Sequence, residues 1–172
     1  MLAIIVGIYT LYILISIYTS IMQIGYVNVA KRKDAILLTQ SEFLKAGNYG
    51  VAKEKLSLVN HFVDFILFLA WIDVGVDFLY TQFYTLDPVY MNIAIVMGFI
   101  VINSLLSLPF AYYEKFVLDT KYGFNKSTLS QWLKDTTISF VMTLVFGSLV
   151  VWGIYEIITN FTLWWLWSFV FI

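Results

Sequence analysis

The side chains best suited to chemistry lie on one apolar stretch, residues 56–80, which contains the single histidine of the chain. His61 and Asp64 are three residues apart, so they share one face of a helix. An imidazole beside a carboxylate can bind a metal ion or pass a proton. The simpler interpretation, which we favour, is that His61 bonds to a neighbour or to water near one end of this stretch.

Three carboxylates follow along the same stretch. Asp64 lies deep in it, where an ionisable group is costly and faces a cavity or a partner. Asp73 and Asp77 are four residues apart and are predicted to face together, roughly opposite His61. They could act as an acid/base pair or bind a cation, but we favour a solvated helix end. An alternative function is a small proton- or cation-coupled membrane transporter that uses Asp64, Asp73 and Asp77.

The composition places these residues in a membrane. The 172 residues are 61% hydrophobic and only 12% charged, whereas a soluble domain is about a quarter charged. The sequence therefore predicts an all-α, polytopic transmembrane helix bundle, a single membrane domain over residues 1–172, with amphipathic loop helices. Four full spans and a truncated fifth are expected at about 2–27, 56–80, 89–108, 137–158 and 161–172.

The charged residues predict how the bundle is oriented. All ten lysines and arginines lie in two loops, residues 28–55 and 109–136. Basic loops stay on the cytoplasmic side, so we expect the N-terminus outside. The fifth segment, residues 161–172, is only about 18 Å long as a helix, against a hydrocarbon core of about 30 Å. We therefore expect the natural chain to continue past Ile172.

The first loop combines charge with apolar side chains. Lys31, Arg32 and Lys33 precede a mixed stretch that runs to Lys55 and is predicted to be an amphipathic segment on the membrane or on the protein's own surface. Its apolar members are Ile36, Leu37, Leu38, Phe43 and Leu44. Turns are predicted at residues 47–50 and 156–160. Gly147 and Gly153 are expected where neighbouring helices approach closely.

The second loop has the most specific local pattern. Leu108-Pro109 is predicted to close an apolar segment, because proline lacks the N–H and disfavours helix before it. Gly123 is predicted to stop a helix by taking positive φ. Thr128 is predicted to start the next helix, with Gln131 completing a capping box. Asn125 is expected to bond the local backbone or to cap the turn.

This loop resembles the N-terminal membrane part of the CAAX prenyl protease family, integral-membrane zinc metallopeptidases. The matching pattern over residues 108–128 is Leu-Pro-Phe-x-Tyr-Tyr-x-x-Phe-Val-x-Asp-x-x-Tyr-Gly-Phe-Asn-Lys-x-Thr, followed by Trp132 and Asp135. A weaker likeness covers residues 41–55. We call residues 109–128 the motif segment. The resemblance implies that this segment docks a catalytic domain through Pro109, Tyr112, Tyr113, Phe116, Asp119, Gly123, Phe124, Asn125, Lys126 and Thr128. Its aromatic residues could instead contact a substrate or prenyl chain.

The resemblance also implies zinc in the full-length parent, a water-filled chamber lined by His61 and Asp64, and lipidated or membrane peptides as substrates. Asp64 could alternatively be a paired structural carboxylate. The family's catalytic signature, His-Glu-x-x-His, is absent, since Phe-Val-Asp follows His61. No cysteine is present either. We therefore expect neither catalytic residues nor metal ligands in this chain alone. A non-catalytic scaffold for another protease subunit remains a third hypothesis, and no pattern indicates nucleic-acid binding.

Overall fold

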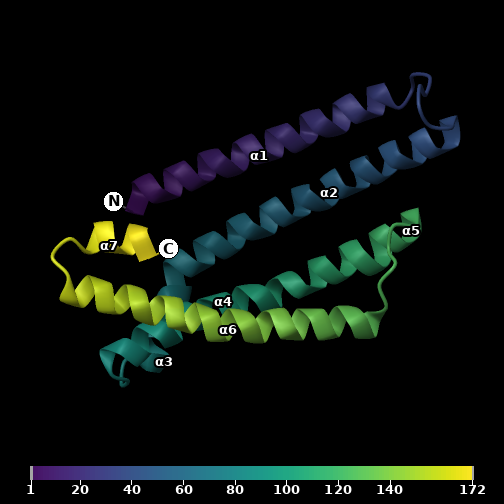
Figure 1. Cartoon of the computed structure of the whole chain (residues 1–172). Coiled ribbons are helices and arrows are strands. Elements are labelled where there is room, and N and C mark those ends of the chain that lie inside the picture. Colours follow the sequence, from purple (N-terminus) through teal and green to yellow (C-terminus); the bar gives the residue numbers. More distant parts are fainter. Residues whose placement is uncertain (1, 172) are drawn as a thin grey trace. The chain divides into compact units, whose positions relative to one another are not determined.

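The computed structural model describes residues 2–171, and every regular element in that range is a helix, as predicted (Figure 1). Two of the helical stretches, η1 and η2, are π-helical turns. The elements in chain order are α1 (Leu2–Ala30), α2 (Gln40–Ala70), η1 (Trp71–Gly75), α3 (Val76–Phe83), α4 (Pro88–Tyr112), η2 (Tyr113–Asp119), α5 (Thr120–Tyr122), α6 (Leu129–Asn160) and α7 (Trp164–Phe171).

The helices bury little of their apolar surface against one another. Within residues 2–171, the buried apolar side chains are Ile13, Val51, Leu79, Met97 and Leu118. Most large apolar side chains are exposed instead, which in water would be a severe aggregation hazard. Such a surface suits lipid, where helices satisfy their own backbone hydrogen bonds.

Three described helical stretches are long and apolar enough to cross a bilayer: Leu2–Ala30, Pro88–Tyr122 and Leu129–Asn160. They overlap the predicted first, third and fourth spans. The predicted second span falls on α2, η1 and α3, which do not meet the same criterion of length and composition. The predicted span boundaries therefore stay predictions.

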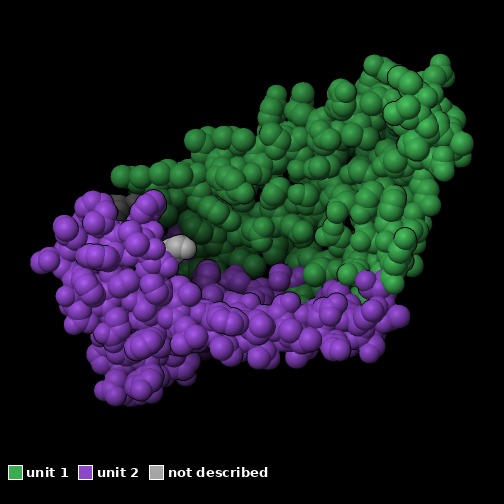
Figure 2. Space-filling model, viewed as in Figure 1, with its two compact units in different colours: residues 1–71, 108–126 green, residues 72–107, 127–172 purple. Residues whose placement is uncertain are grey.

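The chain divides into two compact units, residues 1–71 with 108–126 and residues 72–107 with 127–172 (Figure 2). In the first unit, α1 and α2 form an antiparallel hairpin (Figure 1). The ring of Tyr9 stacks on Phe68, with centroids 3.9 Å apart. Near the other end of the hairpin, Lys31 Nζ donates to Asn48 Oδ1 at 2.9 Å. The hairpin is thus held at both ends.

In the second unit, glycines mark the close helix contacts. A methyl group at Gly98 would lie 3.0 Å from Leu79 Cδ2, and one at Gly147 would lie 3.1 Å from Met97 Cε. A methyl group at Gly153 would lie only 2.5 Å from Phe171 Cζ, where α7 folds back on α6. The predicted close approaches at Gly147 and Gly153 are confirmed.

Two predicted turns are wrong. Residues 47–50 lie inside α2, where a methyl group on Gly47 would lie 3.7 Å from Val27 Cγ1 of α1 and 3.0 Å from Cβ of Lys31, the residue after α1. Residues 156–160 are the last turn of α6, which ends where Phe161 becomes extended. The start of α2 at Gln40 was not predicted. A capping box marks it, in which the Thr39 hydroxyl accepts from the Glu42 N–H and the Glu42 carboxylate accepts from the Thr39 N–H at 3.1 Å.

Candidate functional site: the motif segment on helix α2

The motif segment begins inside a helix, and the prediction that Pro109 ends that helix is wrong. Pro109 lies within α4, which runs on to Tyr112 before the π-helical turn η2. Proline removes one backbone donor from the helix ladder. The carbonyl that loses its donor is that of Leu105, one turn before the proline, whereas η2 starts four residues after it. The helical backbone continues through η2 to Tyr122.

The π-helical geometry determines which side chains face α2. In an α-helix, residues five apart point about 140° away from each other. In a π-helix, residue i bonds to residue i+5, so residues five apart lie on the same face. Glu114 and Asp119 are five apart within η2, and both bond to residues of α2. The π-turn thus brings both carboxylates to the same neighbour.

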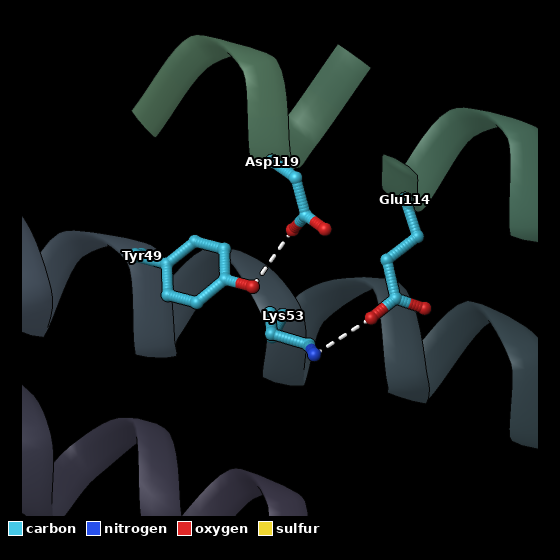
Figure 3. A network of polar contacts seen from close by, with 4 residues as sticks. All are labelled: Tyr49, Lys53, Glu114 and Asp119. Atoms are coloured by element: carbon cyan, nitrogen blue, oxygen red, sulfur yellow. Dashed lines mark hydrogen bonds and ion pairs between the residues drawn. The ribbon is translucent and has the colours of Figure 1, made fainter. Parts of the chain in front are cut away.

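Two polar contacts join η2 to α2 (Figure 3). The Tyr49 hydroxyl donates to Asp119 Oδ1 at 2.7 Å. Lys53 Nζ lies 2.7 Å from Glu114 Oε1. Tyr49 and Lys53 are four apart on α2 and so share one face, matching the spacing of the acids on η2. We call these four residues the α2–η2 network.

Aromatic contacts surround Tyr49. Its ring centroid lies 4.6 Å from that of Phe124 and 5.4 Å from that of Tyr122. Lys53 Nζ also lies 5.6 Å from the Tyr49 ring centroid. Tyr49 therefore contacts the motif segment through both its hydroxyl and its ring.

The pKa shifts of Tyr49 and Lys53 fit a structural role for the network. The hydrogen bond to Asp119, helped by burial, raises the pKa of Tyr49. The bond to Glu114 raises the pKa of Lys53. Both groups belong to the polar first half of α2, outside the predicted spans. Since both already titrate near pH 10, a further rise keeps them protonated at neutral pH. Neither is thus suited to act as a general base there.

The end of α5 is as predicted. Gly123 has φ +76°, its N–H donates to Thr120 O at 3.1 Å, and the Phe124 N–H donates to Asp119 O at 2.8 Å. This pair of bonds is the Schellman arrangement. Asn125 Nδ2 donates to Thr120 Oγ1 at 3.1 Å, a local bond to a side chain, so the predicted bond to the backbone stays a prediction. Asp119 thus accepts bonds through both its side chain and its carbonyl.

The predicted N-cap of α6 is confirmed, while the capping box with Gln131 stays a prediction. The Gln131 N–H donates to Thr128 Oγ1 at 3.2 Å, and the helix begins at Leu129. Lys126 is exposed in the connection before it. These bonds give the motif segment defined ends.

Part of the aromatic surface of the motif segment stays accessible. Tyr112, Tyr113 and Phe124 are 44%, 47% and 51% exposed. The rings of Tyr112 and Phe116 lie 5.1 Å apart, so they form one local cluster. This exposure leaves room for a partner at the aromatic residues that the sequence singled out.

His61 lies on α2, away from the network along the helix. Its Nε2 lies 3.2 Å from Ser57 Oγ, so the predicted bond to a neighbour is confirmed. Asp64 is exposed, and Asp73 (in η1) and Asp77 (in α3) are exposed too. The π-turn interrupts the 3.6-residue period on which their predicted placement opposite His61 depended. Within residues 2–171, no group of three histidines or carboxylates could hold a metal ion.

Tyr49, Lys53 and Glu114 were not predicted as site residues. Tyr49 had been assigned to a turn, and its partner lies 70 residues later. One signal was available: a tyrosine and a lysine four apart, and two acids five apart, in two loops predicted to share one side of the membrane. The five-residue spacing of the two acids places them on one helix face only in a π-helical turn, and nothing in the sequence predicts that turn.

A family model described as the N-terminal region of CAAX prenyl proteases, with five membrane helices, matches residues 27–172. The chain belongs to the CAAX prenyl protease family. CAAX prenyl protease 1 of Saccharomyces cerevisiae is 27% identical over 146 residues, which cover 76% of this chain and 32% of that protein.

A further relative matches over a shorter stretch, and a solved structure matches over nearly the whole chain. The CAAX prenyl protease 1 homologue of Taenia solium is 44% identical over 50 residues, 27% of this chain and 11% of that protein. The crystal structure of Ste24p from S. mikatae shares the fold, with a TM-score of 0.85 at 23% identity. It covers 98% of this chain, which spans 43% of Ste24p.

These similarities settle the class of protein. The five membrane helices of the family description and the apolar helices of this chain make it an integral, multi-pass membrane protein. The chain spans about a third of the length of the yeast relative. Within the family, it corresponds to the N-terminal membrane region.

Proposed function

We propose that this chain is the membrane part of a zinc metalloendopeptidase of the CAAX prenyl protease type. In this role its helices enclose a water-filled chamber in the bilayer, and its motif segment holds a catalytic domain encoded after Ile172. The observation that carries the proposal is the family match over residues 27–172, which includes the whole motif segment. Lipidated or membrane-associated peptides are the proposed substrates.

The α2–η2 network supports the docking role. It fixes the backbone of the motif segment against α2 through two polar contacts of 2.7 Å each. Tyr112 and Tyr113 remain about half exposed, so they are available to a partner. A segment that is fixed on one helix and accessible elsewhere suits a docking surface, because it loses little further conformational entropy when a partner binds.

His61 and Asp64 are proposed to line the chamber. Asp64 is exposed on an apolar part of α2, and water in the chamber would solvate its charge. In the same proposal, the loops at residues 28–55 and 109–136 face the cytoplasm, and the downstream domain lies on that side.

The residues of this chain do not fit a zinc site. One histidine is present in the whole sequence, and the described residues hold no cluster of three metal-ligating side chains. Catalytic zinc sites use three protein ligands. We therefore assign metal binding and peptide hydrolysis to residues outside 1–172.

Co-purification tests the docking role. Residues 1–172 and the region encoded after Ile172 would be expressed as two tagged chains in the same membranes. We expect the two chains to co-purify, and Tyr113→Ala to weaken the association because Tyr113 lies on the accessible aromatic surface. Tyr26→Ala, an exposed aromatic position on α1, is the matched control. A coding sequence that stops at Ile172, or chains that never associate, would remove the proposal.

A further inference from the structure

The connection between α1 and α2 carries the two most exposed large apolar side chains of the described residues. Ile36 is 94% exposed, Leu37 is 95% exposed, and Leu38 beside them is 51% exposed. The sequence left open whether this stretch lies on the membrane or on the protein's own surface. Exposure this complete means that Ile36 and Leu37 pack against nothing within residues 2–171.

The connection nevertheless has a defined shape. Gln40 binds it from the start of α2, since its side chain accepts from the Ala35 N–H at 3.0 Å and donates to Lys33 O at 3.4 Å. Lys31 reaches back to Asn48 on α2. The apolar side chains are thus presented outward by a loop with bonds at both ends.

The length of α1 indicates where this loop lies. Its 29 residues extend about 43 Å, close to the thickness of about 40–45 Å for a bilayer with its headgroups. The surface of α1 stays apolar to its end, since Tyr26 and Val29 are 72% and 61% exposed. A helix of that length and surface ends at headgroup level, and its last residue, Ala30, directly precedes the basic triplet.

The charges of the loop suit the same place. Arg32 and Lys33 are exposed, and only Asp34 beside them is acidic. Basic side chains at the membrane surface are attracted to anionic lipid headgroups. Apolar side chains a few residues away can then enter the boundary between headgroups and acyl chains.

We propose that residues 31–38 are an interfacial anchor for the lipid bilayer. Ile36, Leu37 and Leu38 insert at the acyl boundary of the leaflet in which α1 ends, while Arg32 and Lys33 bind anionic headgroups. The anchor fixes the depth of the α1–α2 hairpin, and through Tyr49 that of the motif segment. This proposal rests on the exposure of the apolar side chains and on the charge of the basic ones, and it does not depend on the proposed peptidase role.

Because the chain contains no cysteine, a single introduced cysteine can be labelled selectively. Leu37→Cys in residues 1–172 would be labelled with an environment-sensitive fluorophore and reconstituted in nanodiscs. Quenching is compared between nitroxide-bearing lipids and aqueous iodide. Tyr26→Cys is the control within the apolar surface of α1, and Ser41→Cys, exposed in the first turn of α2, is the polar control. Ile36→Cys repeats the measurement where Leu37→Cys fails to assemble.

We expect nitroxide lipids to quench the Leu37 label at least about twofold more than the Ser41 label, because an inserted side chain lies at the acyl boundary. Anionic lipid should strengthen the difference, and Arg32→Gln with Lys33→Gln should abolish that strengthening. Iodide quenching equal to that at Ser41 would overturn the proposal. So would protection from both quenchers, which would mean that protein covers the loop. Equal quenching in zwitterionic and anionic membranes would remove the role of Arg32 and Lys33.

Discussion

The phenolic oxygen of Tyr49 lies 2.7 Å from Oδ1 of Asp119, although 70 residues separate them in the sequence. This bond connects the first half of α2 to the last residue of the π-turn η2. Asp119 also accepts the Phe124 N–H through its carbonyl, so one residue links α2 to the turn at Gly123. The position of residues 109–126 in their unit therefore depends on α2 as much as on their own sequence.

Tyr49→Phe should lower the free energy of unfolding by about 1–2 kcal/mol, because it removes the hydrogen bond to Asp119 and keeps the ring contacts. The measurement is denaturant titration of the reconstituted chain. Tyr26→Phe, at a residue that is 72% exposed, is the matched control and should change stability little. Equal effects of the two substitutions would show that the Tyr49 hydroxyl bond does not stabilise the fold.

Lys53 and Glu114 should be energetically coupled, but weakly. Their side chains are 45% and 38% exposed, so solvent screens the 2.7 Å contact, and a coupling energy of about 0.2–1 kcal/mol is expected. A double-mutant cycle with Lys53→Met and Glu114→Gln measures it. Added salt should reduce the coupling. A cycle that closes with no coupling at low salt would contradict the predicted link.

Alkaline pH should weaken the same network. The pKa values of Tyr49 and Lys53 are raised from 10.0 and 10.5, by the bonds to Asp119 and Glu114 respectively. A raised pKa gives stability that is fully present below the unfolded value and is lost as the pH rises through the folded value. Stability should thus fall above about pH 10, and less steeply in Tyr49→Phe and Lys53→Met. Identical slopes in wild type and variants would contradict this.

Gly123→Ala should destabilise the chain by about 1–2 kcal/mol, because φ is +76° at this position and a side chain is strained there. Gly50→Ala is the matched control. Gly50 lies inside α2 with nothing within 4 Å of an added methyl group, so alanine should stabilise by about 0.5–1 kcal/mol. Opposite shifts of the thermal midpoint are expected, and shifts of the same sign would contradict the assigned backbone geometry.

Acid should open the capping box at the start of α2. Hydrogen bonds from Thr39 lower the pKa of Glu42 below 4.5. A lowered pKa gives stability that is present above the unfolded value and is lost as the pH falls through the folded one. The amide resonance of Thr39, whose N–H donates to Glu42 Oε2, should report a transition below pH 4.5 that Glu42→Gln lacks. A midpoint at or above 4.5 would contradict the box.

Local backbone signals in the sequence were sufficient for part of this site. Gly123 and Thr128 were assigned correctly because a left-handed residue and an N-cap each depend on a few neighbouring residues. The all-helical membrane fold was likewise predictable, since apolar length alone indicates it.

The errors arose where packing overrides local preference. Pro109 continues its helix, and Gly47 and Gly50 sit inside α2. Intrinsic preference is a weak guide when a glycine packs closely against a neighbouring segment, as Gly47 does against Val27 and Lys31. The α2–η2 network could not be predicted because it needs both a long-range contact and a π-turn, and neither has a local signature here.

That the peptidase chemistry resides outside residues 1–172 is tested most directly by zinc content per chain. Two purified proteins would be compared by elemental analysis, residues 1–172 and the same chain extended by the residues encoded after Ile172. We predict about one zinc per chain in the longer protein and none in the shorter one. Stoichiometric zinc on residues 1–172, or none on the longer protein, would contradict the assignment.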